Sequence, residues 1–394
     1  MTEDTLVTFN AGSSSLKIGV FEMASGVARS AGRAKIDLET GPPRLSGKIG
    51  GLAFERELVG DPKADLGDVV AQVIDHLHAV LPGKIIAAGH RVVHGGMTFD
   101  APVLLGDQVV TDIEGLIPFA PLHQPAALGV IRAVRDSHPA IAQTASFDTA
   151  FHASQSDLVR RLAIPRAMHD EGVRRYGFHG LSYAYVAHAI ARIDPRAAAG
   201  RVVACHLGSG ASICGMIGGR SVDVSMGFSA LDGIPMATRP GWIDPGALLH
   251  LMRKGMIQPE RLERFLYHEC GLLGVSGISG DTRVLLKDPS REAAEAIDLF
   301  CLRVAGEISR QVATLGGLDA VVFTAGIGEN QPDIRGRIAA RLGWLGLDLD
   351  DGRNEANNQI ISTAKSRITV FVIPTDEEQV IASEALSVVS RHRL

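Results

Sequence analysis

The chain has 394 residues, of which 46% are hydrophobic and 21% charged, a composition typical of a globular protein with large buried cores. Its formal net charge is -5 and it has no block of Lys and Arg, so we expect no nucleic-acid partner. It also has no basic leader and no run of about 18 apolar residues, which argues against a membrane segment and predicts a cytoplasmic protein. The four cysteines lack the CxxC spacing of a zinc site. A small-molecule ligand is therefore the default expectation.

Apolar runs and periodic segments alternate along the chain. Short apolar runs rich in β-branched residues predict strands at 6–9, 17–21, 84–88, 141–147, 201–206, 213–217, 319–324 and 368–373. Segments with 3.6-residue periodicity predict helices at 66–80, 124–135, 182–192, 245–254, 291–315 and 377–390. This alternation predicts an α/β fold in which helices cover a sheet.

The opening stretch NAGSSSLKIGV has a second, weaker copy 196 residues further along the chain. At this offset Gly12 aligns with Gly208 and Ser13 with Ser209, and each copy consists of a strand, a Gly/Ser turn and a strand. Because the offset is half the chain length, we infer that one domain was duplicated, with two unrelated hairpins as the alternative. Two such domains would face each other across a cleft, and the boundary is expected within residues 148–156.

The Gly/Ser turns are suited to bind phosphate. Glycine permits close backbone approach, consecutive main-chain N–H groups form an anion-binding concavity, and serine hydroxyls and Lys17 add donors. The alternative is a solvated Ser-rich loop. No P-loop GxxxxGK[ST] and no Rossmann GxGxxG occurs, so a nucleotide would be held by the paired hairpins. A third glycine loop, TAGIGEN at 324–330, follows a predicted strand and suits a base or ribose.

Two arginines and two carboxylates lie in unusual surroundings. Arg91 and Arg239 are embedded in Gly-rich, otherwise apolar stretches, which favours binding of phosphate or carboxylate over a solvated role. Asp148 and Glu377 follow predicted strands, where α/β sheets place magnesium ligands and catalytic groups. Asp148 could equally cap a helix, and Glu377 could simply lie in the first turn of the last helix.

Three histidines, His123, His179 and His206, lie in turns at strand or helix junctions. None of them has a second histidine or cysteine at the spacing of a zinc site. We therefore consider them as hydrogen-bond donors to a ligand.

Together these motifs resemble the acetokinase (acetate kinase) family, a member of the acetate and sugar kinase, chaperone and actin superfamily. The matching segments follow the family order over nearly the whole chain: NAGSSSLK (10–17), GHRVVHGG (89–96), PLHQP (121–125), FDTAFH (147–152), RRYGFHGLSY (174–183), HLGSGAS (206–212), SMGFSALDG (225–233), TR (238–239), FTAGIGEN (323–330) and PTDEE (374–378).

The resemblance implies a duplicated actin-like (ribonuclease H-like) α/β fold whose two ATPase domains flank a nucleotide-binding cleft. The N-terminal domain would span residues 1–149, with the C-terminal helix 381–394 packed on it. The second domain, 150–380, would carry the nucleotide site and the interface of a homodimer. The implied reaction is reversible phosphoryl transfer from Mg-ATP to acetate, which gives acetyl phosphate and ADP, with Mn²⁺ able to replace Mg²⁺.

The resemblance also assigns roles to matching residues. The implied metal site comprises Asn10, Asp148 and Glu377. The implied catalytic groups are Asp148, Arg91, Arg239, His179 and His123. The implied acetate site comprises Arg91, Val93, Leu122, Phe178 and Ala230. The implied nucleotide contacts are Ser13, Ser15, Lys17, His206, Gly208, Ser209, Gly210, Asp281, Thr282, Arg283, Gly326, Ile327, Gly328 and Asn330.

The inventory suits a carboxylate acceptor. A carboxylate with a pKa of about 4 to 5 is already ionised at pH 7, so the reaction needs charge neutralisation and in-line alignment but no general base. A sugar kinase would need a base to remove a hydroxyl proton, which Asp148 could supply. Two more candidate functions are a propionate or other short-acid kinase and a non-catalytic ATP switch, in which Arg91 and Arg239 would have no carboxylate to bind.

Five positions bear on specificity and affinity. Val93 is bulkier than the alanine typical of propionate kinases and favours acetate, whereas Ala230 replaces a proline and enlarges the pocket. One methylene is worth about 1–3 kcal/mol in an apolar pocket, so propionate should be the slower substrate. Ser209, Trp242 and Asp376 replace Asn, Asp and Asn of the family, at positions close to the implied nucleotide and metal contacts.

Overall fold

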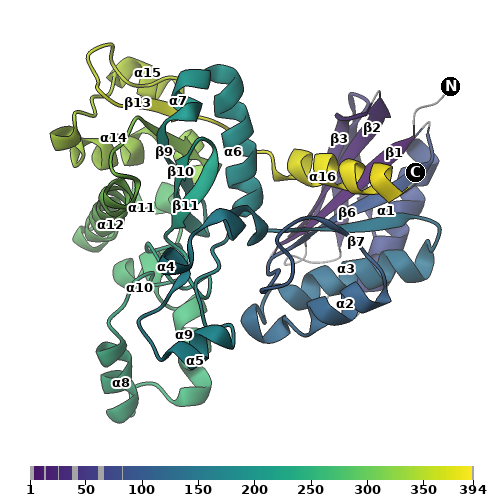
Figure 1. Ribbon diagram of the computed structural model, residues 1–394, viewed down its shortest axis with the longest axis horizontal. Helices are drawn as coiled ribbons and strands as arrows, with labels where there is room; N and C mark the ends of the chain where they lie inside the picture. The colour runs from purple at the N-terminus through teal and green to yellow at the C-terminus, as the bar shows by residue number, and fades with distance from the viewer. Residues whose placement is uncertain are drawn as a thin grey trace. The chain divides into compact units, whose positions relative to one another are not determined.

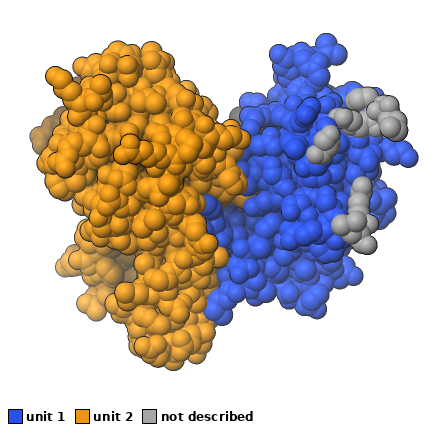
Figure 2. Space-filling view, turned by 45° about the horizontal axis from the view of Figure 1, so that its top comes forward, with its two compact units in different colours: residues 1–151, 376–394 blue, residues 152–375 orange. Residues whose placement is uncertain are grey.

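The computed structural model describes residues 4–12, 15–24, 26–37, 43–60, 66–81 and 83–392 (Figure 1). The chain divides into two compact units (Figure 2): unit 1 comprises residues 1–151 and 376–394, and unit 2 comprises residues 152–375. Each unit is an α/β body with its own mixed sheet. Among the described residues, no helix is long and apolar enough to span a bilayer.

Unit 1 is built on an eight-stranded sheet in the order β5-β4-β3-β2-β1-β6-β8-β7. The strands are β1 (Thr5–Ala11), β2 (Ser15–Ala24), β3 (Val27–Asp37), β4 (Arg44–Ile49), β5 (Leu52–Glu57), β6 (Ile85–Val92), β7 (Val103–Leu104) and β8 (Ala142–Phe147). The helices are α1 (Leu66–Val80), α2 (Asp107–Glu114), α3 (Gln124–Ser137) and α16 (Glu377–His392). β1 to β5 pair antiparallel, whereas β1, β6 and β8 are parallel.

Helices cover both faces of this sheet because alternate residues of β1 point to opposite sides. Leu6 packs with Ala382 and Ala385 of α16, whereas Val7 packs with the apolar stripe of α1 that includes Val73. α16 comes so close to β6 that a Cβ on Gly89 would lie 2.8 Å from the Ile381 side chain. The last helix of the chain is therefore part of the first unit's core.

Unit 2 is built on a five-stranded sheet in the order β11-β10-β9-β12-β13. The strands are β9 (Arg201–Leu207), β10 (Ala211–Ile217), β11 (Arg220–Val224), β12 (Ala320–Thr324) and β13 (Thr369–Val372). The helices are α4 (Asp157–Arg160), α5 (Arg166–Asp170), α6 (Gly180–Ile193), α7 (Pro195–Ala199), α8 (Pro245–Arg253), α9 (Pro259–His268), α10 (Gly271–Ser276), α11 (Thr282–Leu285), α12 (Arg291–Leu315), α13 (Ala325–Asn330), α14 (Pro332–Ala340) and α15 (Asp351–Glu355).

The two sheets share one topology. β3-β2-β1-β6-β8 in unit 1 corresponds to β11-β10-β9-β12-β13 in unit 2: three antiparallel strands followed by two parallel ones. The first hairpin has strands beginning at Thr5 and Ser15, and the second has strands beginning at Arg201 and Ala211, the same 196-residue offset in both cases. The predicted duplication of an α/β domain is therefore confirmed.

Candidate active site

The Gly/Ser turn of unit 1 joins β1 to β2. Gly12 N–H donates to the Ser15 carbonyl at 2.9 Å, which closes the turn, and Asn10 lies opposite Lys17 in the strand register. Asn10 is buried, whereas Lys17 is exposed. The predicted nucleotide contact Ser13 lies outside the described residues.

A cluster of polar side chains, here called the unit 1 charge cluster, lies beside this hairpin: Asn10, Arg91, Asp148, Glu377 and Glu378. Arg91 Nε and Nη2 donate to the two Asp148 carboxylate oxygens at 2.9 and 2.6 Å, and Arg91 Nη1 donates to Asn10 Oδ1 at 3.0 Å. Asn10 Nδ2 donates to Glu377 Oε2 at 2.9 Å and to Glu378 Oε1 at 3.1 Å. The structure thus brings together four predicted residues, together with Glu378, which the sequence did not single out.

Strand ends explain this convergence. Asn10 is near the end of β1, Arg91 is near the end of β6, and Asp148 follows β8, so three parallel neighbours deliver their polar residues to one edge of the sheet. Glu377 and Glu378 open α16, which packs on the same strands. The sequence did not predict the contact between Glu378 and Asn10, because sequence alone does not show which of two adjacent glutamates at the start of a helix faces the sheet.

The unit 1 charge cluster contains more negative than positive charge. Burial alone would lower the pKa of Arg91, but Asp148, followed by Glu377 and Glu378, raises it above the usual value. One guanidinium faces three carboxylates, whose oxygen atoms are ligands that Mg²⁺ prefers. Among the described residues, no three His, Cys, Asp or Glu side chains are arranged to hold a metal by themselves. This donor set fits a Mg²⁺ ion that takes one or two carboxylates and completes its shell with phosphate and water.

The Gly/Ser turn of unit 2 lies between β9 and β10. Gly208 N–H donates to the Gly210 carbonyl at 3.2 Å, and Ala237 N–H donates to the Ser209 carbonyl at 3.2 Å. A Cβ on Gly210 would lie 3.4 Å from His179 Nε2 and 3.9 Å from Arg239 Nη1. The glycine thus lets the turn lie directly against the side chains of His179 and Arg239. We call the turn 208–210, His179 and Arg239 the unit 2 anion wall.

Arg239 is a half-buried cation without a carboxylate partner among the described residues. Its Nη1 donates to the Ala230 carbonyl at 3.4 Å, and its guanidinium lies 5.5 Å from the centre of the Tyr267 ring. Burial lowers the pKa of Arg239, while Tyr267 acts in the opposite direction. A guanidinium held by a carbonyl and an aromatic face keeps its charge available for an anionic ligand.

His179 belongs to the unit 2 anion wall, and the ring of His206 packs against it. Their rings stack with centroids 4.2 Å apart. His179 is the N-cap of α6 and has φ 58°, a left-handed conformation that non-glycine residues rarely adopt. Its Nδ1 lies 2.8 Å from Ser212 Oγ, and His206 Nδ1 lies 2.8 Å from Ser182 Oγ. Strain at a ligand-facing residue is typical of a functional site.

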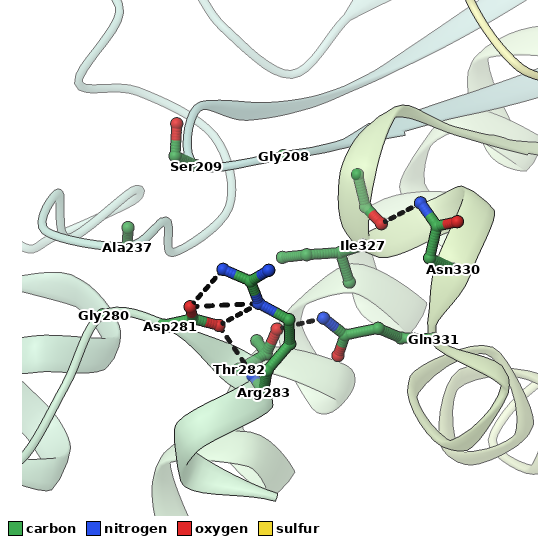
Figure 3. Close-up of a pocket in the computed structure, with 11 residues that line it drawn as sticks. Gly208, Ser209, Ala237, Gly280, Asp281, Thr282, Arg283, Ile327, Asn330 and Gln331 are labelled. Atoms are coloured by element: carbon green, nitrogen blue, oxygen red, sulfur yellow. Dashed lines mark hydrogen bonds and ion pairs between the residues drawn. The ribbon is translucent and has the colours of Figure 1, made fainter. Parts of the chain in front are cut away.

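A cavity of about 550 Å³ opens next to the same turn (Figure 3). It is lined by Gly208, Ser209, Ala237, Gly280, Asp281, Thr282, Arg283, Gly326, Ile327, Asn330 and Gln331. Figure 3 shows the Asp281–Arg283 ion pair, at 2.6 Å, on one side and the α13 residues on the other. Eight of the predicted nucleotide contacts therefore meet in one place, and the sequence did not single out Ala237, Gly280 or Gln331.

This geometry can be compared with known proteins. The acetokinase family matches residues 5–383 of the chain. The chain belongs to the acetokinase family. It is 46% identical over 392 residues to the acetate kinase of Nitrobacter hamburgensis, covering 98% of this chain and 96% of that protein. It is 41% identical over 404 residues to the acetate kinase of Methylocella silvestris, covering 98% of each.

Solved structures of similar proteins have the same fold as this acetokinase. The propionate kinase of Francisella tularensis superposes with a TM-score of 0.90 at 33% identity, covering 98% of this chain and all of that one. The acetate kinase of Porphyromonas gingivalis superposes with a TM-score of 0.86 at 33% identity and the same coverage. The expected family is thus confirmed, and both substrate classes occur among its structural relatives.

Two side chains of the chain, Arg335 and Glu329, support helix α13 and were missed by sequence reasoning. Arg335 is fully buried and donates to the Gly328 carbonyl at 2.8 Å and to the Asn354 carbonyl at 2.7 Å. Glu329 Oε1 accepts from Ala325 N–H at 2.8 Å and from Thr375 N–H at 3.1 Å. The motif GIGEN contains Glu329, but its role as a backbone acceptor is visible only in three dimensions.

The expected acetate-pocket residues belong to both units. In unit 1, Val93 is buried and Leu122 is 43% exposed, and His123 precedes α3 as its N-cap residue. In unit 2, Phe178 is buried and Ala230 is half-buried. Within unit 2, the Ala230 carbonyl accepts the hydrogen bond from Arg239 Nη1, so this expected acetate-pocket residue contacts the unit 2 anion wall.

Proposed function

We propose that the chain reversibly transfers the γ-phosphoryl group of ATP to acetate, forming acetyl phosphate and ADP, the activity stated by the names of its full-length relatives. The observation that carries this proposal is the half-buried guanidinium of Arg239, which lies beside a Gly/Ser turn and His179 and has no carboxylate partner among the described residues. Such an arrangement stabilises charge that develops on a transferring phosphoryl group.

The chain's own residues supply positioning and charge. Main-chain N–H groups of the turn 208–210 and of helix α13 hold the nucleotide. Arg239 and His179 donate hydrogen bonds to the oxygens of the transferring phosphoryl group. A carboxylate oxygen of acetate attacks the γ-phosphorus as the bond to the bridging oxygen of ADP breaks. Acetate is already ionised at neutral pH, so no proton has to be removed.

The environment of Asp148 favours this reaction over a sugar kinase. A sugar kinase needs a carboxylate base that is free to accept a hydroxyl proton. Both Asp148 oxygens instead accept from Arg91, at 2.9 and 2.6 Å, in a bidentate ion pair. Using Asp148 as a base would require that buried pair to be broken.

Magnesium would be held by the unit 1 charge cluster, through Glu377 and Asn10, with Asp148 oriented by Arg91 beside them. When bound, Mg²⁺ neutralises charge on the phosphate oxygens of the nucleotide, and Mn²⁺ can take its place. The excess of carboxylates over cations in the unit 1 charge cluster supports this assignment.

A second candidate substrate is propionate. Ala230 in place of a proline enlarges the acyl pocket, and one structural relative is a propionate kinase. Val93 acts against the larger acid, because its side chain is bulkier than alanine and is buried. We propose acetate as the preferred acid and propionate as a slower one.

A homodimer is part of the same proposal. Several large apolar side chains of unit 2 are exposed, including Trp242, Leu249 and Leu302. Exposed apolar side chains in one unit favour an interface between copies, although single exposed residues are common. Light scattering at micromolar concentration would give twice the chain mass for a dimer and the chain mass for a monomer. ATP as cosubstrate is consistent with a cytoplasmic enzyme.

The testing experiment traps acyl phosphate with hydroxylamine. The protein is incubated with Mg-ATP and acetate, propionate or butyrate, beside a control without acid and one without protein. Hydroxamate that forms fastest with acetate supports the proposal, and a propionate optimum would reassign the substrate. No hydroxamate from any acid would contradict the proposed reaction.

A further inference from the structure

A buried chain of hydrogen bonds fixes one side of the His179 ring. Ser212 Oγ lies 2.8 Å from His179 Nδ1 and 2.5 Å from the Tyr183 hydroxyl. Ser212 belongs to β10 and Tyr183 to α6, and both side chains are fully buried. With the ring of His206 stacked against one face, His179 is held at Nδ1 and along its ring plane.

The other ring nitrogen of His179, Nε2, faces the turn 208–210 and Arg239. A Cβ on Gly210 would lie 3.4 Å from Nε2, and Arg239 Nη1 is 3.9 Å from the same point. A neutral imidazole carries its proton on one nitrogen only, and the partner of one nitrogen determines what the other can do. The tautomer therefore decides whether His179 donates to an anion at this wall or presents a lone pair to it.

We propose that Ser212 and Tyr183 are positioning residues that hold His179 as the Nε2–H tautomer. In this tautomer the N–H donates to the transferring phosphoryl group; the identity of that anion rests on the proposed function. Tyr183 donates its hydroxyl proton to Ser212 Oγ, and Ser212 donates its own to His179 Nδ1. The imidazole proton then resides on Nε2.

The surroundings of Tyr183 support this direction of donation. Burial raises the pKa of Tyr183 well above its usual value, so the hydroxyl keeps its proton. The backbone of His206 hydrogen bonds to the same hydroxyl and lowers this pKa, as a donor to the oxygen does. The Tyr183 oxygen accepts from the main chain, and its proton is directed to Ser212. The opposite direction would leave Nε2 as an acceptor facing an anion, which is repulsive.

The first test reads the tautomer and needs no turnover. Protein labelled with ¹⁵N in histidine is measured by long-range ¹H–¹⁵N correlation NMR, and the His179 signals are assigned by their loss in His179→Gln. The expected result is a proton on Nε2 in the wild type and a mixture of tautomers in Ser212→Ala. A proton on Nδ1 in the wild type, or an unchanged tautomer in Ser212→Ala, would overturn the inference.

The second test separates positioning from packing. Ser212→Ala should lower kcat about ten-fold, the effect of losing one well-placed hydrogen bond, while the KM for ATP changes less than about two-fold. Tyr183→Phe keeps the ring and should lower kcat by a smaller factor, about three-fold, because Ser212 still reaches Nδ1. A KM for ATP that rises as much as kcat falls would contradict the assignment.

A matched control lies in the same unit. Ser362→Ala removes another buried serine hydrogen bond, which Ser362 Oγ accepts from Val370 N–H at 3.1 Å, on the edge strand β13. It should lower the thermal midpoint about as much as Ser212→Ala but leave kcat within about two-fold of the wild type. Equal losses of kcat in the two variants would show a packing effect and overturn the positioning role. If the wild type makes no acyl phosphate, the proposed function fails, and the tautomer spectrum still decides the hydrogen-bond order.

Discussion

Arg91 of unit 1 and Arg239 of unit 2 belong to units with the same five-strand core, but their partners differ in charge. Arg91 forms a bidentate pair with Asp148 and is surrounded by two further carboxylates. Arg239 rests on the Tyr267 ring and a carbonyl, with no carboxylate partner in the part of unit 2 that the structure describes. The duplicated units share one fold, but the residues at their strand ends and turns form two different electrostatic sites, one rich in carboxylates and one containing an arginine and backbone donors.

The difference has a functional meaning. The unit 1 charge cluster presents excess negative charge, which attracts a cation. The unit 2 anion wall presents backbone donors and an arginine that has no carboxylate partner among the described residues, and these groups attract phosphate. The two Gly/Ser turns follow the same contrast. The first is flanked by Asn10 and its carboxylate partners, and the second by His179 and Arg239.

The largest difference should appear in stability. Arg91→Ala leaves the carboxylates of the unit 1 charge cluster, including the nearly inaccessible Asp148, without their cation, and should lower the free energy of unfolding by about 3–5 kcal/mol. Urea unfolding at neutral pH measures the change. Arg44→Ala, which breaks the exposed pair with Glu55 in the same unit, is the control and should cost about 1 kcal/mol or less. Equal shifts in the two variants would contradict the buried-cluster account.

Arg239→Ala should show the opposite profile. Removing a preorganised cation should lower kcat/KM by about 10² to 10³, or roughly 3–4 kcal/mol of transition-state stabilisation. Stability should change little, because no partner carboxylate among the described residues is left unpaired. The hydroxamate assay and urea unfolding are run on the same preparation. A large loss of stability with normal kinetics would reverse the roles of the two arginines.

One buried histidine in each unit should make a similar contribution to acid sensitivity. Burial lowers the pKa of His90 in unit 1 and of His152 in unit 2 to about 4. Between pH 6.5 and 4 the unfolded state binds more protons than the folded state, so stability falls as the pH falls through this window. At pH 5 each histidine should cost about 2 kcal/mol relative to neutral pH.

His90→Gln and His152→Gln test this equality. Each substitution should flatten the dependence of the unfolding free energy on pH by about 1 kcal/mol per pH unit between pH 6 and 4.5. Urea unfolding at several pH values gives the slopes. A slope as steep in both variants as in the wild type would show that the two histidines are not the acid-sensitive groups.

The smallest expected effect concerns the acyl group. Val93→Ala should raise kcat/KM for propionate relative to acetate by about ten-fold, because it removes methyl groups from a buried position in unit 1. Ala230→Pro in unit 2 should change the ratio in the other direction. Competition between the two acids in one hydroxamate assay measures the ratio directly. If neither variant changes the ratio, neither residue lines the acyl pocket.

The sequence predicted the buried strands better than the exposed ones. Continuous apolar runs marked β1, β6, β9 and β12, and all eight predicted strands and six predicted helices are present within a few residues of their expected bounds. β3, β4, β5, β7 and β11 were missed. β3 carries exposed charged residues such as Arg29, Arg33 and Lys35 on one face, so its hydrophobic signal is diluted.

The site was predictable only in part. Gly/Ser turns, Arg91, Arg239 and Asp148 stood out because polar residues in apolar surroundings need an explanation. Ser212, Tyr183 and Tyr267 did not stand out, since each is an ordinary strand or helix residue that becomes important through a contact made far along the chain. Sequence motifs locate the groups that touch ligands more readily than the groups that orient them.

The reverse reaction tests the central claim most directly. Acetyl phosphate and Mg-ADP are mixed with the wild type or with Arg239→Ala, and the ATP formed is measured by luciferase. The account predicts ATP formation by the wild type and at least about a hundred-fold slower formation by a folded Arg239→Ala protein. No ATP from the wild type, or equal rates from the two proteins, would contradict it.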